Sequence, residues 1–149
     1  MDLRELVRDY LTKAQIMQIA TVHDHQPWVA TVYFATDIDL NLYWMSRASR
    51  RHSQEILENP KVAGTIVLPH NYGEKVRGIQ FEGTARQLSD GDAQAGINIY
   101  SSRFWIVEDR ATTAAEGGDQ HFCFQIRPSK FVLFDEVNFP TDPRQELKM

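Results

Sequence analysis

The sequence predicts a mainly β domain in which about seven antiparallel strands close into a barrel, with a few short helices. Most apolar segments are short and rich in β-branched and aromatic residues, which suit a pleated, half-buried surface. Polar turns separate most neighbouring segments, and short connections favour antiparallel pairing. Closing such a sheet into a barrel removes its unpaired edges, so a barrel is the expected architecture.

Composition places the chain among ordinary globular proteins. It has 149 residues, 42% of them hydrophobic and 24% charged, which predicts a single domain, residues 1–149, and argues against disorder. The net charge of −4 leaves no basic surplus for a general nucleic-acid binder. Basic residues instead cluster at Arg47, Arg50 and Arg51, which suits a small anionic ligand.

The same composition indicates a cytoplasmic protein. Its one cysteine, Cys123, cannot form an internal disulfide, as is usual in a reducing compartment, and is expected to be a small core residue. No apolar run approaches the roughly 20 residues of a membrane span, and the N-terminus lacks a signal-peptide core. We therefore expect no membrane partner.

The first elements follow from local patterns. Asp2 can cap a helix that carries apolar residues on one face. Residues 16–22 are predicted to form a strand, which the polar turn 23–27 separates from a second strand at 28–36. Apolar residues alternate onto both faces of this second strand, so we expect both faces to be covered.

A basic segment then joins a strand to a helix. Residues 42–45 favour a strand, and the helix that follows must end before Pro60. Ser49 is a plausible N-cap, which would place free N–H groups, the positive end of the helix dipole, Arg50 and Arg51 at one point. This arrangement can hold a phosphate. The alternative is an ordinary solvated basic helix start.

Two further strands and a helix are expected after Pro60. Residues 61–68 are apolar and β-branched, and residues 76–88 predict a long strand. Gly78 and Gly83 in the long strand indicate bulges or close approach of the backbone. Ser89 can cap the helix that follows.

The C-terminal part contains a loop, two strands and a tail. Residues 107–120 are rich in Ala, Thr and Gly and are expected to form a flexible surface loop. Strands are predicted at 121–127 and 130–136, followed by a polar tail at 137–149.

Four motifs, in this order, resemble the FMN-binding split-barrel family related to pyridoxamine 5′-phosphate oxidase, and within it the small uncharacterised flavin-barrel proteins. The resemblance covers about residues 16–135 and implies an antiparallel split β-barrel. The motifs are the segment WVATVYF at 28–34, Tyr43-x-x-Ser46-x4-Arg51-His52-x7-Pro60, Arg77-Gly-Ile-Gln-Phe-x-Gly83 and Ile126-x-Pro128-x-x-Phe131.

The resemblance implies an FMN site at the interface of a homodimer. Matched position by position, it assigns the phosphate to the Ser46 hydroxyl and to Arg51 and His52, although His52 stands where the family usually has lysine or arginine. The remaining matched residues are Val29, Ala30, Thr31 and Val32 behind the flavin ring, Met45 beside the ribityl chain, and Gln80 in place of a glutamine that falls at Gly78.

Trp105 is expected at the mouth of this pocket, because it follows a helix and precedes the predicted loop. The sequence does not predict a metal site, since no Cys/His set has zinc-ligand spacing. Haem would be a further possible ligand, with His121 or His70 as the axial residue, but the sequence does not favour either histidine.

The implied activity is that of an FMN-dependent oxidoreductase acting on a small molecule, with a nicotinamide donor possible. Two departures argue against pyridoxine phosphate as the substrate: a lysine expected near Phe34 is missing, and no tryptophan- and arginine-rich segment follows Phe131. A flavin-binding or stress-sensing module without turnover is the alternative, because no acid–base pair is evident in the sequence.

Overall fold

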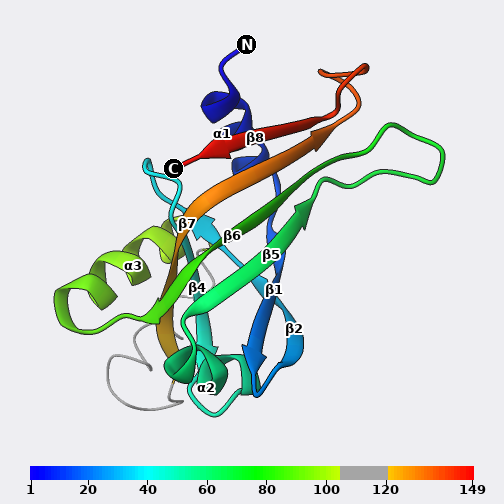
Figure 1. The fold of residues 1–149 in the computed structure, drawn as a ribbon. Coiled ribbons are helices and arrows are strands. Elements are labelled where there is room, and N and C mark those ends of the chain that lie inside the picture. The colour runs from blue at the N-terminus through cyan, green and yellow to red at the C-terminus, as the bar shows by residue number, and fades with distance from the viewer. Residues whose placement is uncertain (105–120) are drawn as a thin grey trace.

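The computed structural model of the chain describes residues 1–104 and 121–149, so Trp105 and the predicted loop 107–120 lie outside the described residues. Eight antiparallel strands form one sheet in the order β2-β1-β5-β6-β7-β4-β3, with β8 also paired to β7. The sheet curls into a half-barrel, which confirms the predicted fold class (Figure 1). The elements are α1 (Leu3–Lys13), β1 (Ile16–His23), β2 (Gln26–Tyr33), β3 (Ala35–Thr36), β4 (Leu42–Arg47), α2 (Arg51–Glu58), β5 (Lys61–Val67), β6 (Arg77–Gln87), α3 (Asp90–Arg103), β7 (His121–Asp135) and β8 (Arg144–Lys148).

The first helix and hairpin form where the sequence predicts them. The Asp2 carboxylate accepts the N–H of Arg4 at 2.9 Å and so caps α1. The β1–β2 hairpin turns at Asp24 and His25, whose φ angles of 48° and 62° are both positive. A two-residue turn with this geometry matches the twist of the two strands and makes His23 and Gln26 a closely bonded pair.

This turn fixes which peptide groups of β2 are paired. Along an antiparallel ladder, hydrogen-bonded residue pairs alternate with pairs that are not hydrogen-bonded. The alternation set by the turn persists to the far end of β2, because the Phe34 N–H donates to the Gln15 carbonyl at 3.1 Å. The alternation therefore directs the peptide groups of Val29 and Thr31 away from β1, towards the free edge of β2.

The barrel is open at this edge. Within the described residues β2 pairs with β1 alone, and β4 pairs with β3 and β7, so no ladder joins β2 to β4. In Figure 1, α2 lies at the lower end of the barrel, below β1, β2 and β4. The open side is thus bounded by the β2 edge, the end of β4 and the start of α2.

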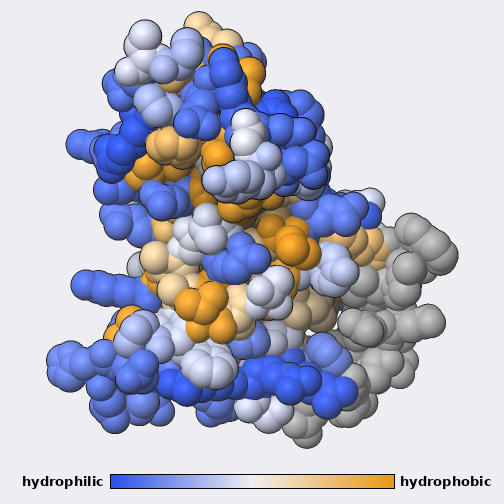
Figure 2. All heavy atoms as spheres, turned by 90° about the vertical axis from the view of Figure 1, so that its right-hand side faces the viewer, coloured by the Kyte–Doolittle hydropathy of each residue, from blue (hydrophilic) through white to orange (hydrophobic). Residues whose placement is uncertain are grey.

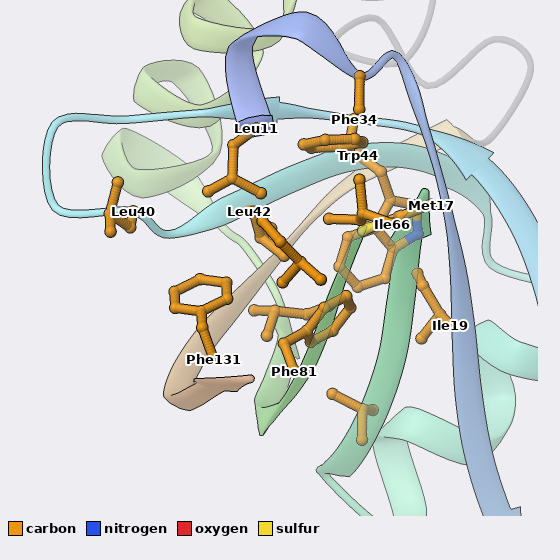
Figure 3. Packing of buried hydrophobic residues seen from close by; sticks show 14 of the residues in the cluster. Leu11, Met17, Ile19, Phe34, Leu40, Leu42, Trp44, Ile66, Phe81 and Phe131 are labelled. Carbon is orange, nitrogen blue, oxygen red and sulfur yellow. The ribbon is translucent and has the colours of Figure 1, made fainter. Parts of the chain in front are cut away.

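Large apolar side chains fill the interior of the half-barrel. Figure 3 shows residues from α1, β1, β4, β5, β6 and β7 pointing towards one another, among them Trp44, Phe81 and Phe131. Each of these three is at most 3% exposed. Trp44 also stacks on Phe124 with ring centroids 5.2 Å apart. The core therefore connects the two halves of the curled sheet.

The expectation that both faces of residues 28–36 are covered is wrong for the protomer. Val29 and Tyr33 on the outer face are 58% and 57% exposed, although the Tyr33 ring meets the edge of the Phe104 ring at the end of α3. The segment is also two strands, since Phe34 turns into the core and Ala35 then pairs with Tyr43 of β4.

The C-terminal prediction needs two corrections. The two strands predicted at 121–127 and 130–136 are one strand, β7, which continues through Pro128. Pro128 is tolerated because the β6–β7 register shifts beside it. At this point the two strands approach so closely that a side chain at position 83, which is glycine, would overlap the Arg127 carbonyl. The predicted tail contains a strand as well, because β8 pairs with β7.

The three described helices cover the outside of the barrel: α1 and α2 lie at its two ends, and α3 lies along one side (Figure 1). α3 packs on β4 and β7, and the Arg103 guanidinium at its end donates to carbonyls at the end of α1, including that of Thr12 at 2.8 Å. No helix among the described residues is long and apolar enough to cross a membrane.

Candidate cofactor site at the open side of the barrel

The site begins where β4 passes into α2. The Arg50 N–H donates to the Arg47 carbonyl at 3.2 Å, so Ser49 lies within a turn and Arg50, not Ser49, is the N-cap. The predicted Ser49 cap is therefore wrong. Because no side chain among the described residues caps α2, its first N–H groups are open to an anion, as the phosphate hypothesis requires.

Ser46 and His52 form a buried pair at this junction. The Ser46 hydroxyl lies 2.8 Å from Nε2 of His52, and the two residues are 7% and 8% exposed. Burial, with the nearby charge of Arg50, lowers the pKa of His52 below its ordinary value. A neutral His52 can donate Nε2–H to Ser46, which leaves the Ser46 hydroxyl free to donate to a ligand.

Arg51 precedes His52 on α2, and its side chain is half exposed. Its guanidinium carbon is 4.2 Å from the centroid of the Trp28 ring, and its Nε donates to Oε1 of Glu55 at 3.3 Å. The Glu55 carboxylate is buried and also accepts the Thr21 hydroxyl, at 3.3 Å. The predicted phosphate-binding arginine therefore already has a buried carboxylate partner.

The other predicted site residues separate into groups. Val29 and Gln80 line the same shallow hollow of about 500 Å³ on the outer face of the sheet. Met45 instead packs towards α3, against the cluster that contains Tyr100, because neighbouring side chains on β4 alternate between the two faces. The structure thus pairs Ser46 with His52, directs the Arg51 side chain to Trp28 and Glu55, and packs the Met45 side chain towards α3.

Glu55 and Thr21 are functional candidates that the sequence analysis did not find. The four-residue spacing of Arg51 and Glu55 on a helix is a recognisable signal for an ion pair. Thr21 is a polar residue on the inward face of β1, in alternation with Met17 and Ile19, which indicates a buried hydroxyl that needs a partner.

The described residues provide neither a reactive thiol nor a cluster of metal-ligating side chains. Burial raises the pKa of Cys123 to about 12, so its reactive thiolate is absent near neutral pH. Within residues 1–104 and 121–149, no three His, Cys, Asp or Glu side chains are arranged to hold a metal ion.

Comparison with known proteins identifies the family. The sequence profile of the pyridoxamine 5′-phosphate oxidase family matches residues 3–131. The chain belongs to this family. It is 29% identical over 104 residues to a UPF0306 protein of Yersinia pseudotuberculosis, covering 69% of this chain and 71% of that protein.

Solved structures of this family's fold include proteins with different ligands. A heme binding protein from Mycobacterium smegmatis superimposes with a TM-score of 0.82 at 10% identity, covering 99% of this chain and 58% of that one. A FAD-binding protein from Mesorhizobium loti superimposes with a TM-score of 0.68 at 19% identity, covering 88% of this chain and 90% of that one. At these identities the likeness establishes the fold alone.

The depressed pKa of His52 predicts that folding stability rises with pH. Below about pH 6.5 an unfolded histidine binds a proton that the buried His52 resists, so stability should fall as the pH is lowered, by up to about 1.4 kcal/mol per pH unit. Urea unfolding between about pH 7.5 and 5.5 measures this slope. His52→Gln should flatten it, whereas His25→Asn in the exposed turn should not. Equal slopes in wild type and His52→Gln would contradict the assignment.

Proposed function

We propose that this chain binds FMN at the open side of the barrel and acts, as a homodimer, as an FMN-dependent oxidoreductase of a small molecule. The observation that carries the proposal is the position of Arg51. Its half-exposed guanidinium lies at a helix start that no described side chain caps, and against Trp28 of the edge strand β2. Arginine at a helix N-terminus suits a phosphate group.

The free edge of β2 supports the flavin part of the proposal. The peptide groups of Val29 and Thr31 offer alternating donors and acceptors, which a heterocycle with polar atoms along one edge can pair with. Ala30 and Val32 would support the ring from the same strand. Met45 could meet the ribityl chain only through its main chain, since its side chain faces α3.

The outer face of the sheet supports a homodimer. Val22 and Val29 are 37% and 58% exposed there, beside the small residues Ala20 and Ala63. Figure 2, which views the side of β1, β2 and β5, shows hydrophobic residues across the middle of this face with hydrophilic residues above and below. Exposed apolar patches of this kind mark association sites, and a second copy would cover both the patch and the hollow that Val29 shares with Gln80.

FMN would supply the redox chemistry, and the chain would contribute binding and orientation. The missing lysine near Phe34 favours a substrate other than pyridoxine phosphate. Oxidoreduction is favoured over storage if NADPH or NADH bleaches the bound flavin and a small oxidised acceptor restores its colour. Resistance to both donors would favour the binding module without turnover.

Arg51→Gln should weaken FMN binding by roughly 10- to 150-fold, because it removes one charge-assisted hydrogen bond of about 1.5–3 kcal/mol. Riboflavin lacks the phosphate, so its affinity should change little. Titration calorimetry of both ligands measures the difference. Glutamine is preferred to glutamate at this position, since a second carboxylate beside buried Glu55 would also destabilise the fold.

The matched control is Arg50→Gln, which removes the neighbouring arginine at the N-cap. It should affect FMN less than Arg51→Gln does. Equal affinities for FMN in wild type and Arg51→Gln would reject the phosphate assignment.

The dimer is tested by Val29→Asp. Sedimentation of the wild type at micromolar concentration should give twice the protomer mass of 17.2 kDa. A carboxylate on the outer face of β2 should shift the protein towards the monomer, because it would be buried without a partner. Ile38→Asp, at a 71% exposed loop position, should leave the dimer intact. A monomeric wild type, with or without flavin, would refute the assembly.

Haem binding is a second candidate, and one observation favours His70 over His121. Nδ1 of His70 lies 3.2 Å from the Leu68 carbonyl oxygen. Because a carbonyl oxygen can only accept a hydrogen bond, Nδ1 carries the ring proton, and the lone pair of Nε2 is left to bind a metal. His70 lines a hollow of about 570 Å³ together with the exposed apolar residues Ile16, Tyr33 and Val67. A flat apolar macrocycle suits such a hollow.

Titration with haemin tests this candidate through the Soret band. His70→Ala should abolish the band of the bound form, while His121→Ala should retain it. Iron-free protoporphyrin is the matched probe, because it should bind both His70→Ala and wild type alike. A Soret band that persists in His70→Ala would exclude this site.

A further inference from the structure

We infer that Glu55 is a positioning residue for the phosphate site, which it serves by holding the Arg51 guanidinium through Nε; this inference rests on the proposed FMN function. The two residues differ sharply in environment. The side chain of Glu55 is 6% exposed and that of Arg51 is 46% exposed. The pair thus has one buried, fixed end and one end open to solvent.

The buried end is fixed by a residue from another element. Thr21 on β1 donates its hydroxyl to Oε2 of Glu55 at 3.3 Å, while Oε1 accepts Nε of Arg51 at the same distance. A surface ion pair on a helix has no such third partner and is usually loose. Thr21 therefore restrains the carboxylate that in turn restrains the arginine.

The aromatic ring of Trp28 supplies the second restraint. The Arg51 guanidinium carbon lies 4.2 Å from its centroid, so the planar group rests against the ring while Nε is bonded to Glu55. Two contacts on different sides of a planar group fix its orientation. With Nε engaged, the two terminal nitrogens have no hydrogen-bond partner among residues 1–104 and 121–149, and such a pair of donors matches two oxygens of a phosphate.

This arrangement has an energetic consequence for ligand selection. A long side chain that is ordered before binding loses less conformational entropy when the ligand arrives, which strengthens binding without a new contact. The Glu55 charge also partly offsets that of Arg51, so anions that cannot use both terminal nitrogens gain little from the site. Glu55 would thereby favour a phosphate group over a generic anion.

Three variants separate positioning from charge. Glu55→Gln keeps an oxygen for Nε and removes the charge, Glu55→Leu removes both, and Thr21→Val removes only the hydroxyl that restrains Glu55. The ratio of FMN to riboflavin affinity should fall about three- to tenfold in Glu55→Leu and about twofold in Thr21→Val. It should stay within about twofold of wild type in Glu55→Gln.

A second readout does not depend on flavin. The Nε–H proton of Arg51, followed by NMR, should exchange slowly with solvent in wild type and Glu55→Gln and rapidly in Glu55→Leu. Inorganic phosphate, used as a probe in the same samples, should bind Glu55→Leu more weakly than wild type. Thermal unfolding of each variant verifies that the fold is retained, and Thr21→Val provides the test if Glu55→Leu does not fold.

The outcomes are distinguishable. If wild type binds neither FMN nor riboflavin, the proposed function fails, and proton exchange together with phosphate binding still decides the role of Glu55. An unchanged affinity ratio with unchanged Nε–H exchange in Glu55→Leu and Thr21→Val would overturn the positioning role. A loss in Glu55→Gln as large as that in Glu55→Leu would overturn it too, because charge and not orientation would then be responsible.

Discussion

The register of the β1–β2 hairpin is the constraint on which the candidate site depends. A two-residue turn with positive φ at Asp24 and His25 sets the pairing, and the ladder keeps that setting as far as the bond between Phe34 and Gln15. A slip of one residue would exchange the two faces of β2. Trp28 would then leave α2 and Val29 would turn inward. The same register decides which peptide groups of β2 face the open side of the barrel.

The start of α2 shows how a basic segment is accommodated next to a core. Glu55 is buried because Arg51 and Thr21 compensate it, and His52 is buried in its neutral form beside Ser46. The three arginines at positions 47, 50 and 51 thus do not form one undivided positive patch. Arg47 and Arg50 are exposed, whereas part of the Arg51 charge is balanced by Glu55 and its guanidinium rests on an aromatic ring. This geometry suits recognition of a defined group better than general attraction of anions.

Val29 connects the two halves of the proposed function. Its peptide group belongs to the free edge of β2, and its side chain belongs to the exposed outer face and to the hollow that Gln80 also lines. Cofactor binding and association of two chains would therefore involve the same strand. Proteins with this fold include a heme binding protein and a FAD-binding protein. The hollow beside His70 lies further along the same face, where Tyr33 pairs with Ile16. A fold alone does not determine a ligand, so under the proposed function the residues around the open side of the barrel would select it.

The sequence alone determined the fold class, because alternating apolar residues and turn residues are local signals that each strand carries by itself. It also located the β4–α2 junction, since residue types and the spacing from Ser46 to Pro60 are visible without coordinates. Only the tertiary structure decided that Arg50 caps α2, that residues 121–135 form one strand through Pro128, and that Val29 is exposed. It also decided that Thr21 reaches Glu55, 34 residues away along the chain. These features depend on contacts between segments that are distant in sequence. A local pattern of residues does not indicate which distant residues will pack against it.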